Sequence, residues 1–269
     1  MVFAPHLLAD KVAIVTGGGT GIGRGIALEL ARSGARVVVA GRRHEPLEAV
    51  AAEIAAMERE SRAIPTDVRD WDQVQAMVDG TVTAFGGLDI LVNNAGGQFS
   101  APFHTLSSSA WKSVIDLNLN GVFNCTRTAA DVFIPQRRGK VINIIAAFSR
   151  RAAPNLAHSG AARAAVENLT RSLALEWAPY NIQVNCISPV VLTEAFMKNM
   201  SAAPGAMERF IDSVPAGRGA TLQEVGWLAV YLASHASDYM TGEHLVMDGG
   251  YWLATAVGAP AQVAPREQS

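Results

Sequence analysis

The sequence lacks several features, and each absence removes a class of protein from consideration. Only two of the 269 residues are cysteines, Cys125 and Cys186, so a disulfide-stabilised fold is not expected and a reducing compartment fits. Charged residues make up 17% of the chain and the formal net charge is −2, which provides no basic surface for nucleic acid. No apolar run approaches the roughly 20 residues of a membrane span. The six histidines show no metal-ligand spacing, so no metal site is expected.

Targeting signals are missing as well. The first residues lack a charged region followed by an apolar core, and the chain ends in EQS rather than in a peroxisomal SKL. We therefore expect a cytoplasmic protein that does not associate with membranes.

Short β-branched runs alternate with longer helical patterns through most of the chain. This alternation predicts an α/β fold, a doubly wound Rossmann-type parallel sheet of about seven strands with helices on both faces. We expect one domain over residues 1–256, a flap at about 189–214 and a disordered tail over 257–269. The expected strands are Val12–Thr16, Val37–Ala40, Ala63–Asp67, Ile90–Asn93, Val141–Ile145, Ile182–Ile187 and His244–Met247. The expected helices are Gly21–Ser33, Glu45–Glu60, Asp70–Phe85, Ser109–Phe133, Ala161–Trp177 and Leu222–Ala233.

A glycine-rich turn directly follows the first expected strand and begins the first expected helix. Glycines there let the backbone approach a pyrophosphate, and the helix N-terminus supplies amide donors. The spacing is Gly-x-x-x-Gly-x-Gly, which differs from the ordinary dinucleotide pattern and from a Walker A loop. A tight structural turn is the alternative. The candidate cofactor-binding residues in this turn are Gly17, Gly19, Thr20, Gly21, Ile22 and Gly23.

The end of the second expected strand predicts the choice of cofactor. Enzymes that select NAD usually carry an acidic residue here for the ribose 2′-hydroxyl. This chain has Gly41 followed by Arg42, and a guanidinium can pair bidentately with a 2′-phosphate. The prediction is NADP(H), and the alternative is a solvated arginine pair at the start of the next helix.

Four blocks together resemble the short-chain dehydrogenase/reductase family over about residues 9–250. They are the glycine turn, Asn93–Gly96, Asn118–Phe123 and Asp248–Gly250. The resemblance implies a seven-stranded parallel sheet, usually in a homotetramer. It also implies that Asp67, Val68, Asn93, Ala95, Gly96, Pro189 and Thr193 contact the cofactor, although Val190 replaces the glycine that usually follows Pro189 and Thr193 lies one position early.

The catalytic block departs from this family. The usual pattern has Ser at a strand end, Tyr thirteen residues later and Lys four residues after that. Here these positions hold Ala146, Ser159 and Arg163, and only Asn118 remains of the usual four. A phenol tuned by a lysine is the usual acid, worth about 10²–10⁴ in rate, and a Ser hydroxyl is a far weaker one. Ordinary carbonyl chemistry is therefore disfavoured.

Two hypotheses remain after this loss. One is a nucleotide-binding scaffold without turnover. The other is hydride transfer to a conjugated thioester, where charge develops on the thioester oxygen and water can return a proton to carbon. In that hypothesis the catalytic candidates are Asn118, Ser159 and Arg163, and Arg163 also grips the cofactor ribose.

Within the family, Asn93–Phe99 and His158–Trp177 are most similar to the peroxisomal trans-2-enoyl-CoA reductases. That likeness implies NADPH-dependent saturation of the 2,3 double bond of an acyl-CoA, with Gln98, Phe99 and Ser159 as candidate substrate contacts. The related 2,4-dienoyl-CoA reductases also place Ser in the Tyr position. They retain the Lys and have a Tyr where this chain has Phe148, so dienoyl or other activated-alkene reduction is the alternative.

Overall fold

The computed structural model describes residues 2–200 and 204–254 and contains a seven-stranded parallel sheet in the order β3-β2-β1-β4-β5-β6-β7. The strand order reverses between β1 and β4, the place where open α/β sheets bind ligands at their carboxyl ends. The predicted fold class is confirmed. The strands are β1 (Val12–Thr16), β2 (Arg36–Gly41), β3 (Ser61–Pro65), β4 (Ile90–Asn93), β5 (Gly139–Ile144), β6 (Ile182–Pro189) and β7 (His244–Met247).

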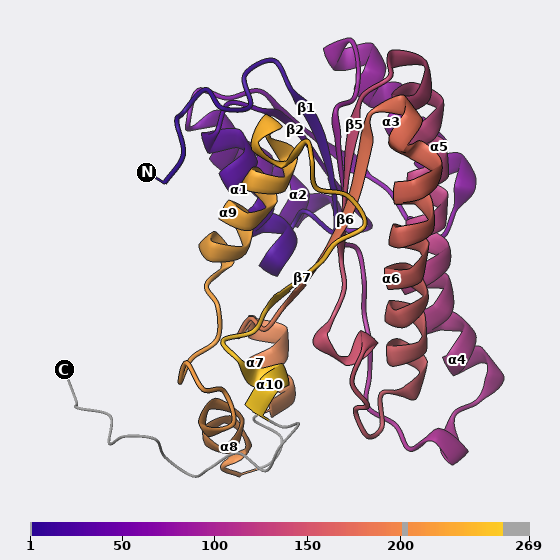
Figure 1. Ribbon diagram of the computed structural model, residues 1–269, viewed down its shortest axis with the longest axis vertical. Coiled ribbons are helices and arrows are strands. Elements are labelled where there is room, and N and C mark those ends of the chain that lie inside the picture. Colours follow the sequence, from indigo (N-terminus) through magenta and orange to yellow (C-terminus); the bar gives the residue numbers. More distant parts are fainter. Residues whose placement is uncertain (1, 201–203, 255–269) are drawn as a thin grey trace.

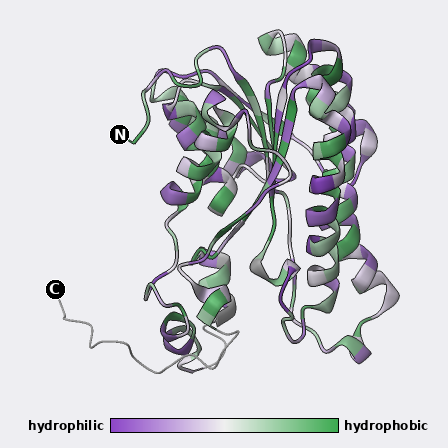
Figure 2. Cartoon of the chain, viewed as in Figure 1, coloured by the Kyte–Doolittle hydropathy of each residue, from purple (hydrophilic) through white to green (hydrophobic). Residues whose placement is uncertain are grey.

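Helices cover both faces of this sheet (Figure 1). One layer consists of α1 (Gly21–Arg32), α2 (His44–Ala55) and α9 (Leu222–Ala233), and the other of α3 (Trp71–Phe85), α5 (Gly121–Gln136) and α6 (Ala157–Trp177). Because both faces are covered, the central strands are buried at every position, as in β1 and β4. Figure 2 shows hydrophobic and hydrophilic residues alternating along α6, as expected of a helix with one buried side. In the described part of the chain, no helix is long and apolar enough to cross a membrane.

Several predicted boundaries were wrong. Strand β3 begins at Ser61, two residues early, and α2 ends at Ala55, five residues early. The single helix expected over Ser109–Phe133 is instead α4 (Ser108–Ile115), a π-helical turn at Asp116–Asn120 and α5. Helix α6 begins at Ala157, four residues before the predicted Ala161, so Ser159 lies inside its first turn.

The expected flap folds into two short helices, α7 (Glu194–Met200) and α8 (Ala206–Asp212). Figure 1 shows them beside the C-terminal helix α10 (Tyr251–Ala254), beyond the carboxyl end of β7. Three rings join these helices: Phe196 and Phe210 lie 4.9 Å apart between centroids, and Phe210 and Tyr251 lie 5.3 Å apart. The flap therefore packs against α10, while the tail predicted over 257–269 lies outside the described residues.

Candidate active site

The glycine turn after β1 exposes backbone at the start of α1. Gly17 and Gly21 have positive φ angles of +64° and +53°, which L side chains rarely adopt. A Cβ on Gly23 would lie 2.2 Å from the Gly17 carbonyl oxygen, so this glycine permits the tight packing of the turn. At Gly21 the nearest atom to such a Cβ is 3.7 Å away, on Thr193. The first-turn amides of α1 receive no side-chain cap from Thr20, so the turn fits a pyrophosphate.

The carboxyl ends of β2 and β3 carry the residues predicted to contact the adenosine part of the cofactor. Arg42 is exposed directly after β2, in a position where its guanidinium can meet a 2′-phosphate. Arg69 Nε donates to Asp67 Oδ1 at 2.9 Å, and this hydrogen bond is the main reason why the pKa of Asp67 lies below its usual value. Val68 is buried and packs against Gly121, where a Cβ would lie 2.6 Å from Val68 Cγ2. Arg42 and Asp67 therefore lie at the edge of the sheet where the adenosine part of a dinucleotide is predicted to bind.

The end of β4 is fastened to the glycine turn by a residue absent from the predicted set. Asn94 Nδ2 donates to the carbonyl oxygens of Thr16 at 3.0 Å and Gly17 at 3.2 Å. The Asn93 side chain instead points into the core and donates to Thr126 at 2.9 Å and to Asn143 at 2.8 Å. Asn93 is only 2% exposed, so this side chain holds neighbouring elements together in the core. The doubled Asn of this block was the available signal for Asn94.

Asn118, Arg163 and Gly96 form a compact group at the centre of the site. Asn118 Nδ2 donates to the carbonyl oxygens of Gly97 at 2.7 Å and Val114 at 2.9 Å, and Asn118 Oδ1 accepts from the Gly97 N–H at 3.2 Å. Both amide hydrogens of Asn118 are therefore engaged with the backbone. This arrangement makes Asn118 a positioning residue for Gly97, and its predicted catalytic role stays a prediction.

Arg163 lies beneath the turn that follows β4. Its Nη1 donates to the carbonyl oxygen of Ile144 at 2.7 Å, at the end of β5. A Cβ on Gly96 would lie 2.5 Å from Arg163 Nη2, so the guanidinium packs directly against the Gly96 backbone. Burial lowers the pKa of the guanidinium to about 10, which leaves Arg163 charged at neutral pH. The charge of the usual lysine is thus retained in this position.

Ser159 and His158 contact the segment that follows β4. The buried Ser159 hydroxyl donates to Gln98 Oε1 at 2.8 Å, and Gln98 is itself exposed. The rings of His158 and Phe99 lie 4.6 Å apart between centroids. His158 is fully buried, and its ring nitrogens have no hydrogen-bond partner among the described residues. The predicted substrate contacts Gln98, Phe99 and Ser159 therefore lie together.

The other predicted contacts lie at the edge of the flap. Pro189 ends β6, and the Thr193 hydroxyl accepts from the Phe196 N–H at 3.2 Å at the start of α7. Because the Thr193 methyl group also approaches Gly21, the flap begins directly against the glycine turn. No other contact of Pro189 bears on its predicted cofactor role, which stays a prediction.

A buried charge cluster behind the site was missed by the sequence analysis. Glu167 on α6 accepts from Arg150, from Arg171 and, at 2.7 Å, from the Ser149 hydroxyl. Burial raises the pKa of Glu167, but these hydrogen bonds outweigh it and lower the pKa to about 2. The nearby His244 is buried, and desolvation lowers its pKa. Arg171 lies one helical turn after Glu167 on α6, but Ser149, Arg150 and His244 are distant in sequence, so no local pattern indicates the whole cluster.

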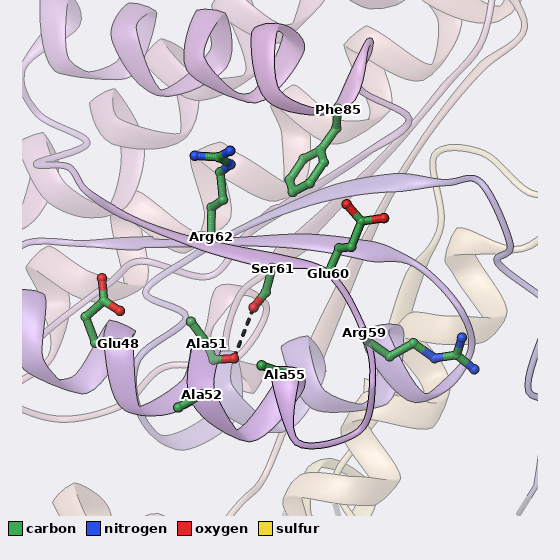
Figure 3. Close-up of a pocket in the computed structure, with 9 residues that line it drawn as sticks. All are labelled: Glu48, Ala51, Ala52, Ala55, Arg59, Glu60, Ser61, Arg62 and Phe85. Carbon is green, nitrogen blue, oxygen red and sulfur yellow. Dashed lines mark hydrogen bonds between the residues drawn. The ribbon is translucent and has the colours of Figure 1, made fainter.

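A pocket lies elsewhere on the molecule, between α2 and β3 (Figure 3). Its lining includes Arg59, Arg62 and Phe85, and the Ser61 hydroxyl donates to the Ala51 carbonyl oxygen at 3.1 Å across one side. It lies at the amino end of β3, whereas the predicted site residues follow the carboxyl ends of the strands. This pocket is therefore separate from the candidate site.

Metal and thiol chemistry find no support in the described residues. Within residues 2–200 and 204–254, no group of three His, Cys, Asp or Glu side chains is placed to hold a metal ion. Cys125 and Cys186 are buried, and burial raises the pKa of each thiol to about 12. Both thiols are therefore protonated at neutral pH, and a protonated thiol is a weak nucleophile.

Comparison with known proteins places these features in context. A family model described as enoyl-(acyl carrier protein) reductase matches residues 17–252. A probable 2,4-dienoyl-CoA reductase from Bacillus subtilis is 39% identical over 91% of this chain and 98% of its own length. A peroxisomal 2,4-dienoyl-CoA reductase from Rattus norvegicus is also 39% identical, over 94% and 87%. The crystal structure of a gluconate 5-dehydrogenase from Burkholderia cenocepacia, in complex with NADP and tartrate, superposes with a TM-score of 0.88 at 33% identity, over 93% and 99%.

Proposed function

Because this chain belongs to the short-chain dehydrogenase/reductase family of NAD(P)-dependent oxidoreductases, we propose that it reduces a conjugated carbon–carbon double bond of an unsaturated acyl-CoA with NADPH. One observation carries the proposal: the positions of the usual catalytic Ser, Tyr and Lys hold Ala146, Ser159 and Arg163. A carbonyl reaction needs an acid to protonate the oxygen, whereas a conjugated thioester can take its proton at carbon. Arg163 keeps the positive charge of the usual lysine, whereas Ser159 lacks the phenol of the usual tyrosine.

The substrate class favoured here is a 2,4-dienoyl-CoA, with a 2-enoyl-CoA as the second candidate. The sequence alone favours the opposite order, because Asn93–Phe99 and His158–Trp177 are most similar to the trans-2-enoyl-CoA reductases. Relatives that carry the dienoyl name support the change. Both substrates share one chemistry, in which charge passes along the conjugated system to the thioester oxygen. When bound, NADPH supplies the hydride for this reduction.

Gln98 is the side chain best placed to stabilise that oxygen. The Ser159 hydroxyl donates to Gln98 Oε1, which fixes the orientation of the amide and leaves its NH₂ group as a donor. Donors aimed at a developing oxyanion are worth about 10²–10³ in kcat. In this proposal Ser159 positions Gln98, and water returns the proton to carbon. Arg163 supplies positive charge beneath the Gly96 backbone and supports the ribose.

NADPH is proposed over NADH because of Arg42. The residue is exposed at the end of β2 and follows Gly41 in place of an acid, so a 2′-phosphate would gain a charged partner and a 2′-hydroxyl would not.

The function is tested by NADPH consumption with a matched panel of 2,4-dienoyl-CoA, 2-enoyl-CoA and 5-keto sugar acid substrates, alongside NADPH binding measured by fluorescence. We expect turnover of the dienoyl-CoA and slower turnover of the enoyl-CoA, with no consumption on the keto acid. Ordinary rates on the keto acid would reject the mechanism. NADPH binding without consumption on any substrate would favour a scaffold that has lost turnover.

We also propose a homotetramer, as the family resemblance implies. Phe123 on α5 is 50% exposed and Leu175 on α6 is 81% exposed, which leaves apolar side chains on the outer helices. Sedimentation velocity tests the assembly: the proposal expects a species of four chains, and a monomer at micromolar concentration would contradict it.

A further inference from the structure

Glu167 is a buried acid that the proposed reaction does not use. Its side chain is 5% exposed, and a buried carboxylate is costly unless it is paired and hydrogen-bonded. Glu167 Oε1 accepts from Arg150 and Arg171, and Oε2 accepts from the Ser149 hydroxyl at 2.7 Å. His244 Nδ1 lies 3.3 Å from Oε2. These groups come from three parts of the chain, so Glu167 joins elements that are far apart in sequence.

Two of these partners belong to the segment that links β5 to α6, residues 145–156, here called the β5–α6 segment. It carries Ala146, in the usual Ser position, and leads into the first turn of α6 with Ser159. Ser149 and Arg150 hold the middle of this segment against Glu167. Arg171, in contrast, lies on α6 itself, one turn after Glu167. The two arginines therefore neutralise the same carboxylate, but only Arg150 fixes the segment.

The β5–α6 segment continues the connection to the flap. The Arg151 guanidinium lies over the ring of Tyr251, 4.8 Å from its centroid. Tyr251 contacts Phe210 on α8, and Phe210 contacts Phe196 on α7. A continuous series of contacts thus runs from Glu167 through the adjacent residues Arg150 and Arg151 to both flap helices.

His244, the first residue of β7, links Ser188 near the end of β6 to the same carboxylate. Its Nε2 lies 2.7 Å from the Ser188 hydroxyl, and Ser188 directly precedes Pro189, where the flap region begins. The order Ser188, His244, Glu167 matches the residue types of a hydrolytic triad. Ser188 is 0% exposed, so no substrate can reach its hydroxyl. These contacts therefore hold the strand ends in place.

We propose that Glu167 is a positioning residue that fixes the substrate-side wall of the cleft, the β5–α6 segment together with the flap helices that pack against it through Tyr251. The effect on substrate binding rests on the proposed function, because that function names the substrate. The effect on the mobility of the β5–α6 segment does not depend on it. Glu167 thus has an effect on acyl-CoA binding that is separate from cofactor binding.

The decisive experiment compares Arg150→Gln with Arg171→Gln, because each removes one cation from Glu167. Arg150→Gln should raise KM for the acyl-CoA about tenfold, the effect of losing one charged hydrogen bond, with the NADPH Kd unchanged. Arg171→Gln should leave both constants within about twofold. Equal effects of the two variants would overturn the proposal, because they would show that Glu167 acts only through charge balance. Glu167→Gln should match or exceed Arg150→Gln, and the exposed Glu176→Gln on the same helix is its control.

A second measurement does not depend on turnover. Hydrogen exchange followed by mass spectrometry should show faster exchange over residues 146–152 in Arg150→Gln than in Arg171→Gln or the unaltered protein. Unchanged exchange in Arg150→Gln would overturn the positioning role whatever the substrate is. If no acyl-CoA is consumed by the unaltered protein but exchange changes as expected, the proposed function fails and the positioning role stands.

Discussion

The nucleotide half and the catalytic half of the candidate site differ in what forms them, backbone in one and side chains in the other. The nucleotide half consists of backbone held at close range: Gly17, Gly21 and Gly23 form the turn, and Asn94 ties it to β4. The catalytic half consists of side chains that contact one another across the sheet, such as Ser159 with Gln98 and Arg163 with the Ile144 carbonyl oxygen. A glycine turn accepts few substitutions, because larger residues would clash or strain the backbone. A site made of side chains changes its chemistry when a single residue is replaced. The chain therefore keeps the cofactor turn of its family and departs from it at the catalytic positions.

The largest expected effect is the loss of activity when Arg163, in the catalytic half of the site, is replaced. Arg163→Ala should lower kcat by about 10³, because it removes the only cation beneath Gly96 in the described part of the site. Arg163→Lys should retain part of the activity, since it restores a charge without the planar fork. Steady-state kinetics at saturating NADPH measure both variants. Full activity of Arg163→Ala would show that the charge takes no part in the reaction.

Replacing Gln98 tests its proposed role as the hydrogen-bond donor to the thioester oxygen. Gln98→Leu should lower kcat by about 10² with little change in NADPH affinity. Ser159→Ala should have a smaller effect, about tenfold, because Gln98 remains but its amide is no longer fixed. If Ser159→Ala proves far more damaging than Gln98→Leu, the serine and not the amide contacts the substrate.

Replacing Arg42 tests the proposed contact with the 2′-phosphate in the nucleotide half of the site. Arg42→Asp should weaken NADPH binding by about 10–100-fold, the value of a charged hydrogen bond and its reversal, and leave NADH almost unchanged. Arg43→Asp is the matched control, because Arg43 is an equally exposed neighbour at the start of α2. Fluorescence titration gives the Kd of each variant for NADPH and for NADH, to be compared with the values of the unaltered protein. An equal loss for NADPH and NADH would reject the 2′-phosphate contact.

The smallest expected effect concerns acid stability. The pKa of His244 is lowered by desolvation, so the unfolded chain binds this proton first and stability falls as the pH drops below about 6.5. The pKa of Glu167 is lowered to about 2, so its contribution is present above about 4.5 and is lost as the pH falls from there toward 2. Thermal unfolding of His244→Gln between pH 7 and 5 should depend less on pH than unfolding of the unaltered protein. An unchanged slope would show that His244 does not contribute in this range.

The sequence predicted the fold well where the signal was local. Helix α9 was predicted with its observed bounds, and its capping box of Thr221 and Glu224 gives it a defined start. The break between α4 and α5 was missed, because Asp116–Asn120 contains no glycine or proline that would mark the π-helical turn. The early start of α6 was missed for a related reason, since Leu156 provides no side-chain cap.

The sequence by itself determined the doubly wound sheet, the nucleotide turn and the missing phenol, because strand–helix alternation, glycine spacing and residue identity are all local properties. Only the tertiary structure decided that Asn118 is saturated by backbone, that Ser159 meets Gln98 and that Glu167 pairs with Arg150 and lies beside His244. Such partners lie on different elements, up to 77 residues apart for Glu167 and His244. Their meeting depends on strand order and on the packing of helices across the sheet, which no short stretch of sequence contains.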